Sequence, residues 1–359
     1  MTAAAVLSPS SQATSEIPAY HQVPETEYEL GVKVEWADLA TLDLSKFDQP
    51  GGNEELSSQL FEAIRRSEQV DQQFAIGKEV FQLPTEEKQK YRADLEHGGY
   101  NGYKPLGLRH QETRPGIFDN TEIYNIPKFI PALEQAHPDV IHAHRREIEA
   151  FVRYIHENVV GKLLVLFARV LELPDDDYVL RSHRYAERSD CHLRYMKYHR
   201  RTPSRIGRWV CMPSPTSTST SVSGEEAEGG ESYHSWKWVE PLPGSITVNI
   251  ADSLEFLTNG FLKSSIHRVV APPPDQAEID RLGVLYFVRP EDSLELKPVV
   301  SRVLERLGYD ESTDGGAVGI TAGEWVKARV ASGVSRGNRR GVMCLSSILW
   351  EGKSAKYYD

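Results

Sequence analysis

The chain has 359 residues, of which 40% are hydrophobic and 26% charged, and its formal net charge is −11. This length suits one large domain or two ordinary ones with a real apolar core. The acidic balance, without any basic block, argues against nucleic acid or an anionic membrane surface as the main partner. No run reaches the ~18 apolar residues of a membrane span, and residues 1–20 lack the regions of a signal peptide. We therefore expect a cytoplasmic monomer that acts on a small molecule.

The cysteines are few and scattered. Cys191, Cys211 and Cys344 are widely spaced and odd in number, so they form neither a disulfide framework nor a CxxC metal clamp. Isolated free thiols in a reducing compartment are the expectation.

The front half of the chain has helical periodicity. Residues 1–30, rich in Ala, Ser, Thr and Pro, have no period and are expected to be a disordered lead. Apolar positions recur at helical spacing over 53–91, which predicts one long helix or two in succession. The glycine- and aromatic-rich stretch 98–107 predicts a loop. Over 138–173 the spacing is that of a long amphipathic helix.

The second half changes to short apolar runs that are β-branched or aromatic and mostly bounded by Pro and Gly. This pattern is typical of a sandwich or barrel of short strands. The predicted strands are 192–198, 245–250, 265–270 and 283–288. Residues 301–359 return to helical character, best seen over 321–330, which Thr321 can cap with Glu324 three residues on.

Several segments together resemble one family. Their order and spacing match the distal half of the core of the iron(II)- and 2-oxoglutarate-dependent dioxygenases, in the branch of isopenicillin N synthase and the plant flavonoid oxygenases. A fungal 2-oxoglutarate-Fe(II) type oxidoreductase is the variety that the resemblance suggests. The phrase Phe81 to Lys88 in the front half agrees, and the resemblance covers about residues 36–300. The matching segments are 236–252, 257–260, 264–270 and 281–287.

The resemblance implies an α+β fold with a double-stranded β-helix core, the cupin-like jelly roll, between a helical N-terminal region and a helical C-terminal tail. On this basis the chain divides into a disordered lead, a helical dioxygenase region, a jelly-roll core for Fe(II) and 2-oxoglutarate with a low-complexity insert at 212–232, and a helical tail. The corresponding limits are 1–30, 31–180, 181–300 and 301–359.

The resemblance also assigns site residues. A non-haem Fe(II) oxygenase needs two imidazoles and a carboxylate on one face of the metal, which leaves room for the oxo-acid and O₂. His267 corresponds to the distal metal ligand. Arg281 stands where the family holds the far carboxylate of 2-oxoglutarate, and Tyr198 aligns with a tyrosine that often touches it, although a packed strand tyrosine explains it equally well. The family's usual Arg-x-Ser has Gly283 at its third position here, so one hydroxyl donor is lost.

The two other metal ligands are missing from their expected place. A His-x-Asp pair should precede His267 by roughly 50–60 residues, but the window 212–232 contains nine Ser or Thr residues among 21 and reads as a disordered insert. The segments His137 to Asp139 and His110 to Glu112 lie in the wrong topological place and are expected to be solvated loops. His199 or His234 is the remaining alternative for completing the metal site.

A second departure lies at 63–70, where the family inserts a glycine-aromatic strand and this chain continues from one helical pattern to the next. Two explanations stay open for both gaps. Either the protein has lost catalysis, or the splice sites or reading frame of the sequence are misassigned over these stretches.

Two functions follow. The first is an oxidoreductase that uses Fe(II), 2-oxoglutarate and O₂ to hydroxylate, desaturate or cyclise a small molecule in secondary metabolism or catabolism. The second is a pseudoenzyme or binding module of the same fold, which retains the Arg281 pocket but cannot hold iron, because one imidazole leaves the ion mostly to water.

Overall fold

The fold is α+β, with one antiparallel sheet and helices packed against it. The computed structural model describes residues 56–108, 119–200, 219–220, 246–264, 267–268, 276–309 and 320–335. The helices are α1 (Leu56–Gln82), α2 (Thr85–Gln89), α3 (Asp139–Ala143), α4 (Arg145–Tyr154), α5 (Gly161–Val170), α6 (Asp252–Leu257), α7 (Arg302–Arg306) and α8 (Ala322–Ser335). The strands are β1 (Gly102–Lys104), β2 (Thr121–Pro127), β3 (His192–Tyr198), β4 (Ser219–Thr220), β5 (His267–Arg268) and β6 (Arg281–Phe287).

The main sheet has the strand order β1-β2-β3-β6, and all of its pairings are antiparallel. Strand β3 is an interior strand that pairs along its whole length with β2 on one side and with β6 on the other. Its last residue, Tyr198, is opposite both Thr121 and Arg281. Strands β4 and β5 form a separate two-residue pairing.

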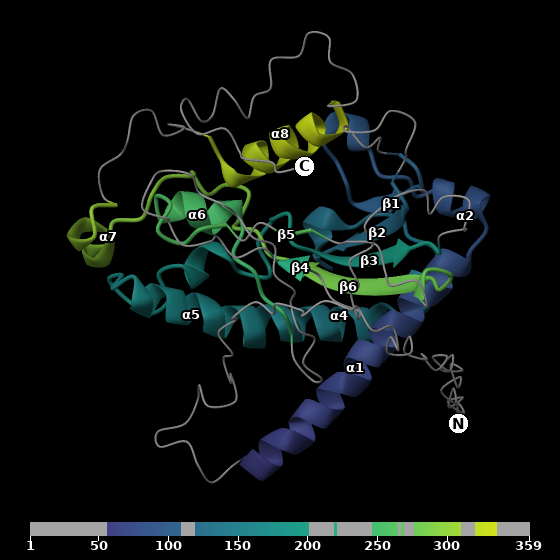
Figure 1. Cartoon of the computed structure of the whole chain (residues 1–359), viewed down its shortest axis with the longest axis horizontal. Coiled ribbons are helices and arrows are strands. Elements are labelled where there is room, and N and C mark those ends of the chain that lie inside the picture. Colours follow the sequence, from purple (N-terminus) through teal and green to yellow (C-terminus); the bar gives the residue numbers. More distant parts are fainter. Residues whose placement is uncertain are drawn as a thin grey trace, which may run out of the picture.

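The main sheet has its apolar core on one face, against α1, α3 and α4. In Figure 1, α4 and α5 run along one side of the sheet, and α6 and α8 lie on the opposite side. The core between the sheet and the helices includes the fully buried side chains of Ile76 on α1, Ile148 on α4, and Tyr124 and Leu193 on the strands. This core fixes the orientation of the sheet, and therefore also fixes what its other face presents.

The predicted helices occur, with interruptions. The pattern over 53–91 forms two helices, α1 and α2, which part at Pro84 because a proline disfavours helical geometry in the residue before it. The pattern over 138–173 becomes α3, α4 and α5, with a π-helical turn at Ile155–Val160 between the last two. At the start of α8, the amide of Glu324 donates to Thr321 Oγ1 and the amide of Thr321 donates to Glu324 Oε2, which confirms the predicted cap.

The strands differ more from expectation. Strand β3 matches its predicted range, whereas β6 begins two residues earlier than predicted. Residues 246–250 form no strand, and the side chains of Ile246 and Val248 are more than half exposed, so apolar alternation there is not matched by burial. Strand β2 has no counterpart among the predicted strands, and β1 lies within the predicted loop.

Three expectations concern residues outside the described ones: the lead 1–30, the cysteines Cys211 and Cys344, and most of the insert 212–232. Within that insert the structure describes only β4, a two-residue strand in a segment expected to be disordered. Cys191 is a buried free thiol, as predicted. The domain limits stay a prediction, and β1 and β2 lie within the region expected to be helical. None of the described helices combines the length and the apolar character that a membrane crossing requires.

The core predicts a clear contrast between two aliphatic truncations. Ile76→Ala removes a side chain with no exposed surface and leaves a cavity against the sheet, so it should lower the free energy of unfolding by about 2–5 kcal/mol. Val170→Ala, at a side chain that is 57% exposed, should change it by less than about 0.5 kcal/mol. Urea denaturation followed by circular dichroism measures both, and equal losses would contradict this assignment of the core.

Candidate functional site

The strand register separates the main sheet into two faces. Side chains alternate along a strand, and residues paired across antiparallel strands project to the same side. The face that holds Tyr124, Leu193 and Tyr195 packs on the helices. We call the opposite face the pocket face. By register, its members on the three long strands are Thr121, Ile123, Asn125, Pro127, His192, Arg194, Met196, Tyr198, Arg281, Gly283, Leu285 and Phe287.

Two of the three site residues predicted from the sequence meet at one end of the pocket face. Tyr198 and Arg281 are register partners, and the guanidinium carbon of Arg281 lies 4.5 Å from the centroid of the Tyr198 ring. Burial lowers the pKa of Arg281, and a hydrogen bond to Tyr198 acts in the opposite direction. Among the residues that the structure describes, no carboxylate forms an ion pair with Arg281. The pair therefore presents a largely desolvated cation without an internal counterion in that part of the chain.

The third predicted site residue, His267, is the first residue of β5 and is paired with Thr220 of β4. Its side chain lies outside the description, so its position relative to Arg281 stays a prediction. Within the described ranges there is no group of three or more His, Cys, Asp or Glu side chains that could hold a metal ion. The described residues thus fit a carboxylate at Arg281 but do not complete a three-ligand iron site.

The only His-x-Asp segment of the sequence has a structural role. His137 is buried rather than solvated, and its Nδ1 lies 2.9 Å from the hydroxyl of Tyr124. Burial lowers the pKa of His137 to about 4, so the ring is neutral near pH 7. Asp139 begins α3, on the helical side of the sheet. His110 and His234 lie outside the described residues.

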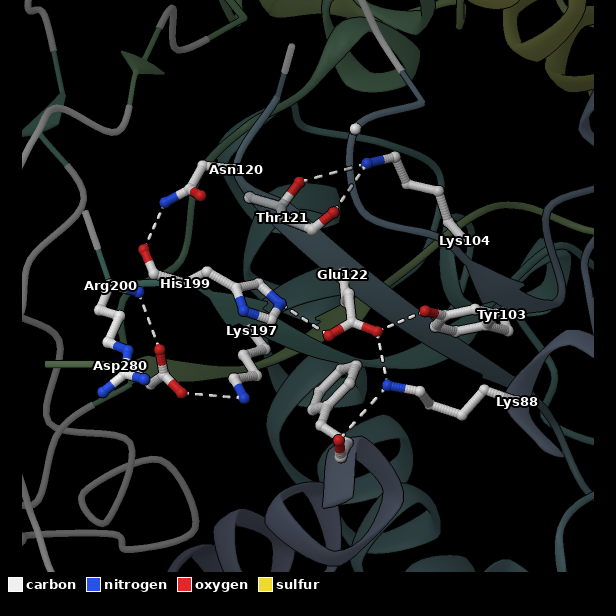
Figure 2. Close-up of polar contacts among 12 residues, drawn as sticks. Lys88, Tyr103, Lys104, Asn120, Thr121, Glu122, Lys197, His199, Arg200 and Asp280 are labelled. Carbon is white, nitrogen blue, oxygen red and sulfur yellow. Dashed lines mark hydrogen bonds and ion pairs between the residues drawn. The ribbon is translucent and has the colours of Figure 1, made fainter. Parts of the chain in front are cut away.

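A buried carboxylate, Glu122 of β2, binds side chains from three other segments (Figure 2). Its Oε1 accepts hydrogen bonds from Lys88 Nζ at 2.6 Å and from the hydroxyl of Tyr103, and its Oε2 lies 2.6 Å from His199 Nε2. Burial acts to raise the pKa of Glu122, but the hydrogen bonds from His199, Lys88 and Tyr103 outweigh it and hold the pKa at about 2. His199 is therefore engaged by Glu122, which weakens its case as a substitute metal ligand.

His199 is also fixed through its backbone, because its amide donates to the carbonyl oxygen of Asn120 at 3.0 Å and its carbonyl oxygen accepts from the Asn120 side chain. Next to it, Asp280 accepts from the amide of Arg200 at 2.8 Å and pairs with Lys197 Nζ at 2.9 Å. Figure 2 shows these contacts side by side with the Glu122 cluster. Both strand ends that carry Tyr198 and Arg281 are thus held by carboxylates.

The far end of the pocket face carries a second polar group that sequence reasoning missed. The His192 ring stacks on Phe287, with centroids 4.7 Å apart and planes within 9°. The Arg194 guanidinium carbon lies 4.4 Å from the centroid of Phe287, and its Nε donates to Asn125 Oδ1 at 2.8 Å. Alternation along the predicted strand from Tyr198 would have placed Arg194 on this face. Glu122 and Asn125 gave no such signal, because no strand is predicted over β2.

Comparisons with known proteins agree on one family. A family model described as the 2OG-Fe(II) oxygenase superfamily matches residues 190–290. A UPF0676 protein of Schizosaccharomyces pombe is 30% identical over 279 residues, which cover 73% of this chain and 80% of that protein. The 2-oxoglutarate-dependent dioxygenase gloE of Glarea lozoyensis is 27% identical over 304 residues, covering 79% and 89%.

Two solved structures match this chain in fold. A full-length Neurospora crassa protein, solved in complex with alpha-KG, matches with a TM-score of 0.58 and 18% identity, over 81% of this chain and 95% of that one. A 2OG-Fe(II) oxygenase family protein of Caulobacter crescentus matches with a TM-score of 0.54 and 23% identity, over 74% and 86%. At these identities the likeness concerns the fold.

The Glu122 cluster predicts a pH-dependent contribution to stability. Glu122→Gln should lower the free energy of unfolding at pH 7 by about 3–5 kcal/mol, because it leaves Lys88 buried without its counterion. The folded pKa of about 2 lies below the ordinary value of 4.5, so this contribution is complete above about pH 5 and is lost as the pH falls towards 2. Denaturation curves between pH 7 and pH 2 should therefore show the two proteins converging.

Glu134→Gln is the matched control, because Glu134 is paired with Arg145 at the surface. Its loss should cost no more than about 1 kcal/mol. A constant gap between wild type and the Glu122 variant over the whole pH range would contradict the assignment of an ionised Glu122.

Proposed function

Because the chain belongs to the 2OG-Fe(II) oxygenase superfamily, we propose that it binds 2-oxoglutarate at Arg281 and oxidises a small molecule with Fe(II) and O₂. The reaction proposed is a hydroxylation, desaturation or ring closure in secondary metabolism or small-molecule catabolism. The proposal includes a jelly-roll core within the limits predicted from the sequence, together with the monomeric state and the cytoplasmic location expected there.

The observation that carries the proposal is the environment of Arg281. A guanidinium offers two parallel N–H donors to a carboxylate, which an ammonium group cannot do. Here that guanidinium is partly removed from water beside Tyr198 and has no carboxylate partner among the described residues. Desolvating a cation is unfavourable unless an anion pairs with it. A dicarboxylic acid that brings its own anion to Arg281 compensates this cost.

The roles of the chain's own residues follow from the geometry. Arg281 binds the far carboxylate, and Tyr198, held against the guanidinium, limits the directions in which it can point. Gly283, two residues further on the same face, contributes no side-chain donor. Bound Fe(II) supplies the chemistry of O₂ activation in this family. His267 is the one candidate imidazole for it that the family's motif provides.

The ligand set supports a second candidate, a binding module that holds the oxo-acid without iron. No His-x-Asp occurs anywhere between residues 190 and 290, the range matched by the family model. A single imidazole holds a hexacoordinate ion much more weakly than three protein ligands do. In this alternative Arg281 and Tyr198 bind the dicarboxylate as they do in the oxygenase.

One anaerobic experiment separates the two candidates. Purified protein is mixed with Fe(II) and 2-oxoglutarate, its absorption is recorded, and succinate is measured after O₂ is admitted with candidate substrates. An oxygenase shows a metal-to-ligand charge-transfer band and then releases succinate. If calorimetry detects binding of 2-oxoglutarate but neither signal occurs, the result supports the binding module. If no binding is detected, the result contradicts both candidate functions.

Replacement of Arg281 tests the shared part of the proposal. Arg281→Gln and Arg281→Lys should each weaken 2-oxoglutarate binding by about tenfold or more, because the first loses the charge and the second loses the paired donors. Arg306→Gln, at an exposed arginine of α7 paired with Glu172, is the control and should leave binding unchanged. Isothermal titration calorimetry measures all three. Unaltered affinity in both Arg281 variants would remove the basis of the proposed function.

A further inference from the structure

The acidic residue closest in sequence to Arg281 is Asp280, the residue immediately before it. Its Oδ2 lies 2.9 Å from Lys197 Nζ, and its Oδ1 accepts a hydrogen bond from the amide of Arg200 at 2.8 Å. Figure 2 shows the carboxylate between these two donors. Partial burial acts to raise the pKa of Asp280, but the hydrogen bonds from Arg200 and Lys197 together lower it below its ordinary value, so the group is ionised near pH 7.

The strand geometry shows on which side of the sheet the Asp280 carboxylate lies. Lys197 and Tyr198 are consecutive residues of β3, so their side chains project to opposite faces of the sheet. Tyr198 is on the pocket face with Arg281, and Lys197 is on the helical face in register with Glu122. Asp280 precedes Arg281 by one residue, so the same alternation directs its carboxylate to the helical side, where Lys197 binds it.

The negative charge of Asp280 affects how an anionic ligand binds at Arg281. An anionic ligand at Arg281 lies one residue from a fixed negative charge, which would repel the ligand and compete with it for the guanidinium. Lys197 places a positive charge directly against that carboxylate. Arg200 contacts Asp280 through its backbone amide, and the nearby ring of His199 is engaged by Glu122. Lys197 is therefore the cation that neutralises Asp280 among the described residues.

We propose that Lys197 and Asp280 are positioning residues that set the affinity of the pocket for its dicarboxylate. Lys197 holds Asp280 on the helical side of the sheet and neutralises it, and this reserves the guanidinium of Arg281 for the ligand. Neither residue touches the ligand in this arrangement. The inference rests on the proposed binding of 2-oxoglutarate at Arg281.

The test compares Lys197→Gln, Asp280→Asn and the double variant by calorimetric titration with 2-oxoglutarate, under anaerobic conditions and both with and without Fe(II). Lys197→Gln should weaken binding by roughly two- to fivefold, the scale of a partly exposed charge pair. Asp280→Asn should bind at least as tightly as wild type. The double variant should recover to within about twofold of Asp280→Asn, because the charge that Lys197 neutralises is then absent.

A merely structural pair gives a different pattern. If the contact only stiffens the strand ends, the double variant binds as weakly as Lys197→Gln or more weakly, and the inference is wrong. Salt gives an independent readout, since the deficit of Lys197→Gln relative to wild type should shrink between 0.05 and 0.5 M NaCl, at about the concentrations where screening becomes strong. A deficit that salt does not alter also contradicts the inference.

Arg306→Gln again serves as the matched loss of an ion pair, away from the pocket face. Denaturation midpoints of each variant establish that binding is compared between folded proteins. The proposed function and this inference fail on different results. If the Arg281 variants bind 2-oxoglutarate like wild type, the proposed function is wrong. If the Arg281 variants bind more weakly but Lys197→Gln binds like wild type, only this inference is wrong.

Discussion

The buried carboxylate of Glu122 is the interaction on which the geometry around Arg281 depends. It joins Lys88 of α2, Tyr103 of β1 and His199 at the end of β3, three segments distant in the sequence. A charge so deeply buried is tolerated only when donors surround it, and here three do. Because β3 is an interior strand of the sheet, fixing its end through His199 also fixes Tyr198 and, through register, Arg281.

The same sheet serves two purposes on its two faces. The helical face is closely packed, with aromatic side chains such as Tyr124 and Tyr195 against α1, α3 and α4, and carries charge only towards its end, at Glu122 and Lys197. The pocket face carries Arg281 and Arg194 at separate ends, each beside an aromatic ring. Strand alternation alone separates the two faces, because adjacent residues such as Lys197 and Tyr198 project to opposite sides of the sheet.

Much of this arrangement could be predicted from the sequence, and the rest could not for identifiable reasons. The helical front half and β3 follow from periodicity, and the family follows from its motifs, which also assigned Tyr198 and Arg281 to one ligand. Strand β2 could not be predicted because Glu122 and Asn125 interrupt its apolar positions, and their burial depends on partners far along the chain. Contacts such as Lys197 with Asp280 join residues 83 positions apart, beyond the reach of any local pattern.

The surroundings of Gly283 show whether packing requires a glycine at this position of the motif. A Cβ built at this position would lie 3.6 Å from Leu285 Cδ1 and 3.9 Å from Met196 Cβ, which are ordinary contact distances, and its backbone needs no left-handed conformation. Sterically, then, the site can accommodate a small side chain such as serine. The absent hydroxyl is a chemical difference rather than a packing requirement. A glycine in the middle of β6 therefore leaves free, on this face of the sheet, the space that a serine side chain would fill.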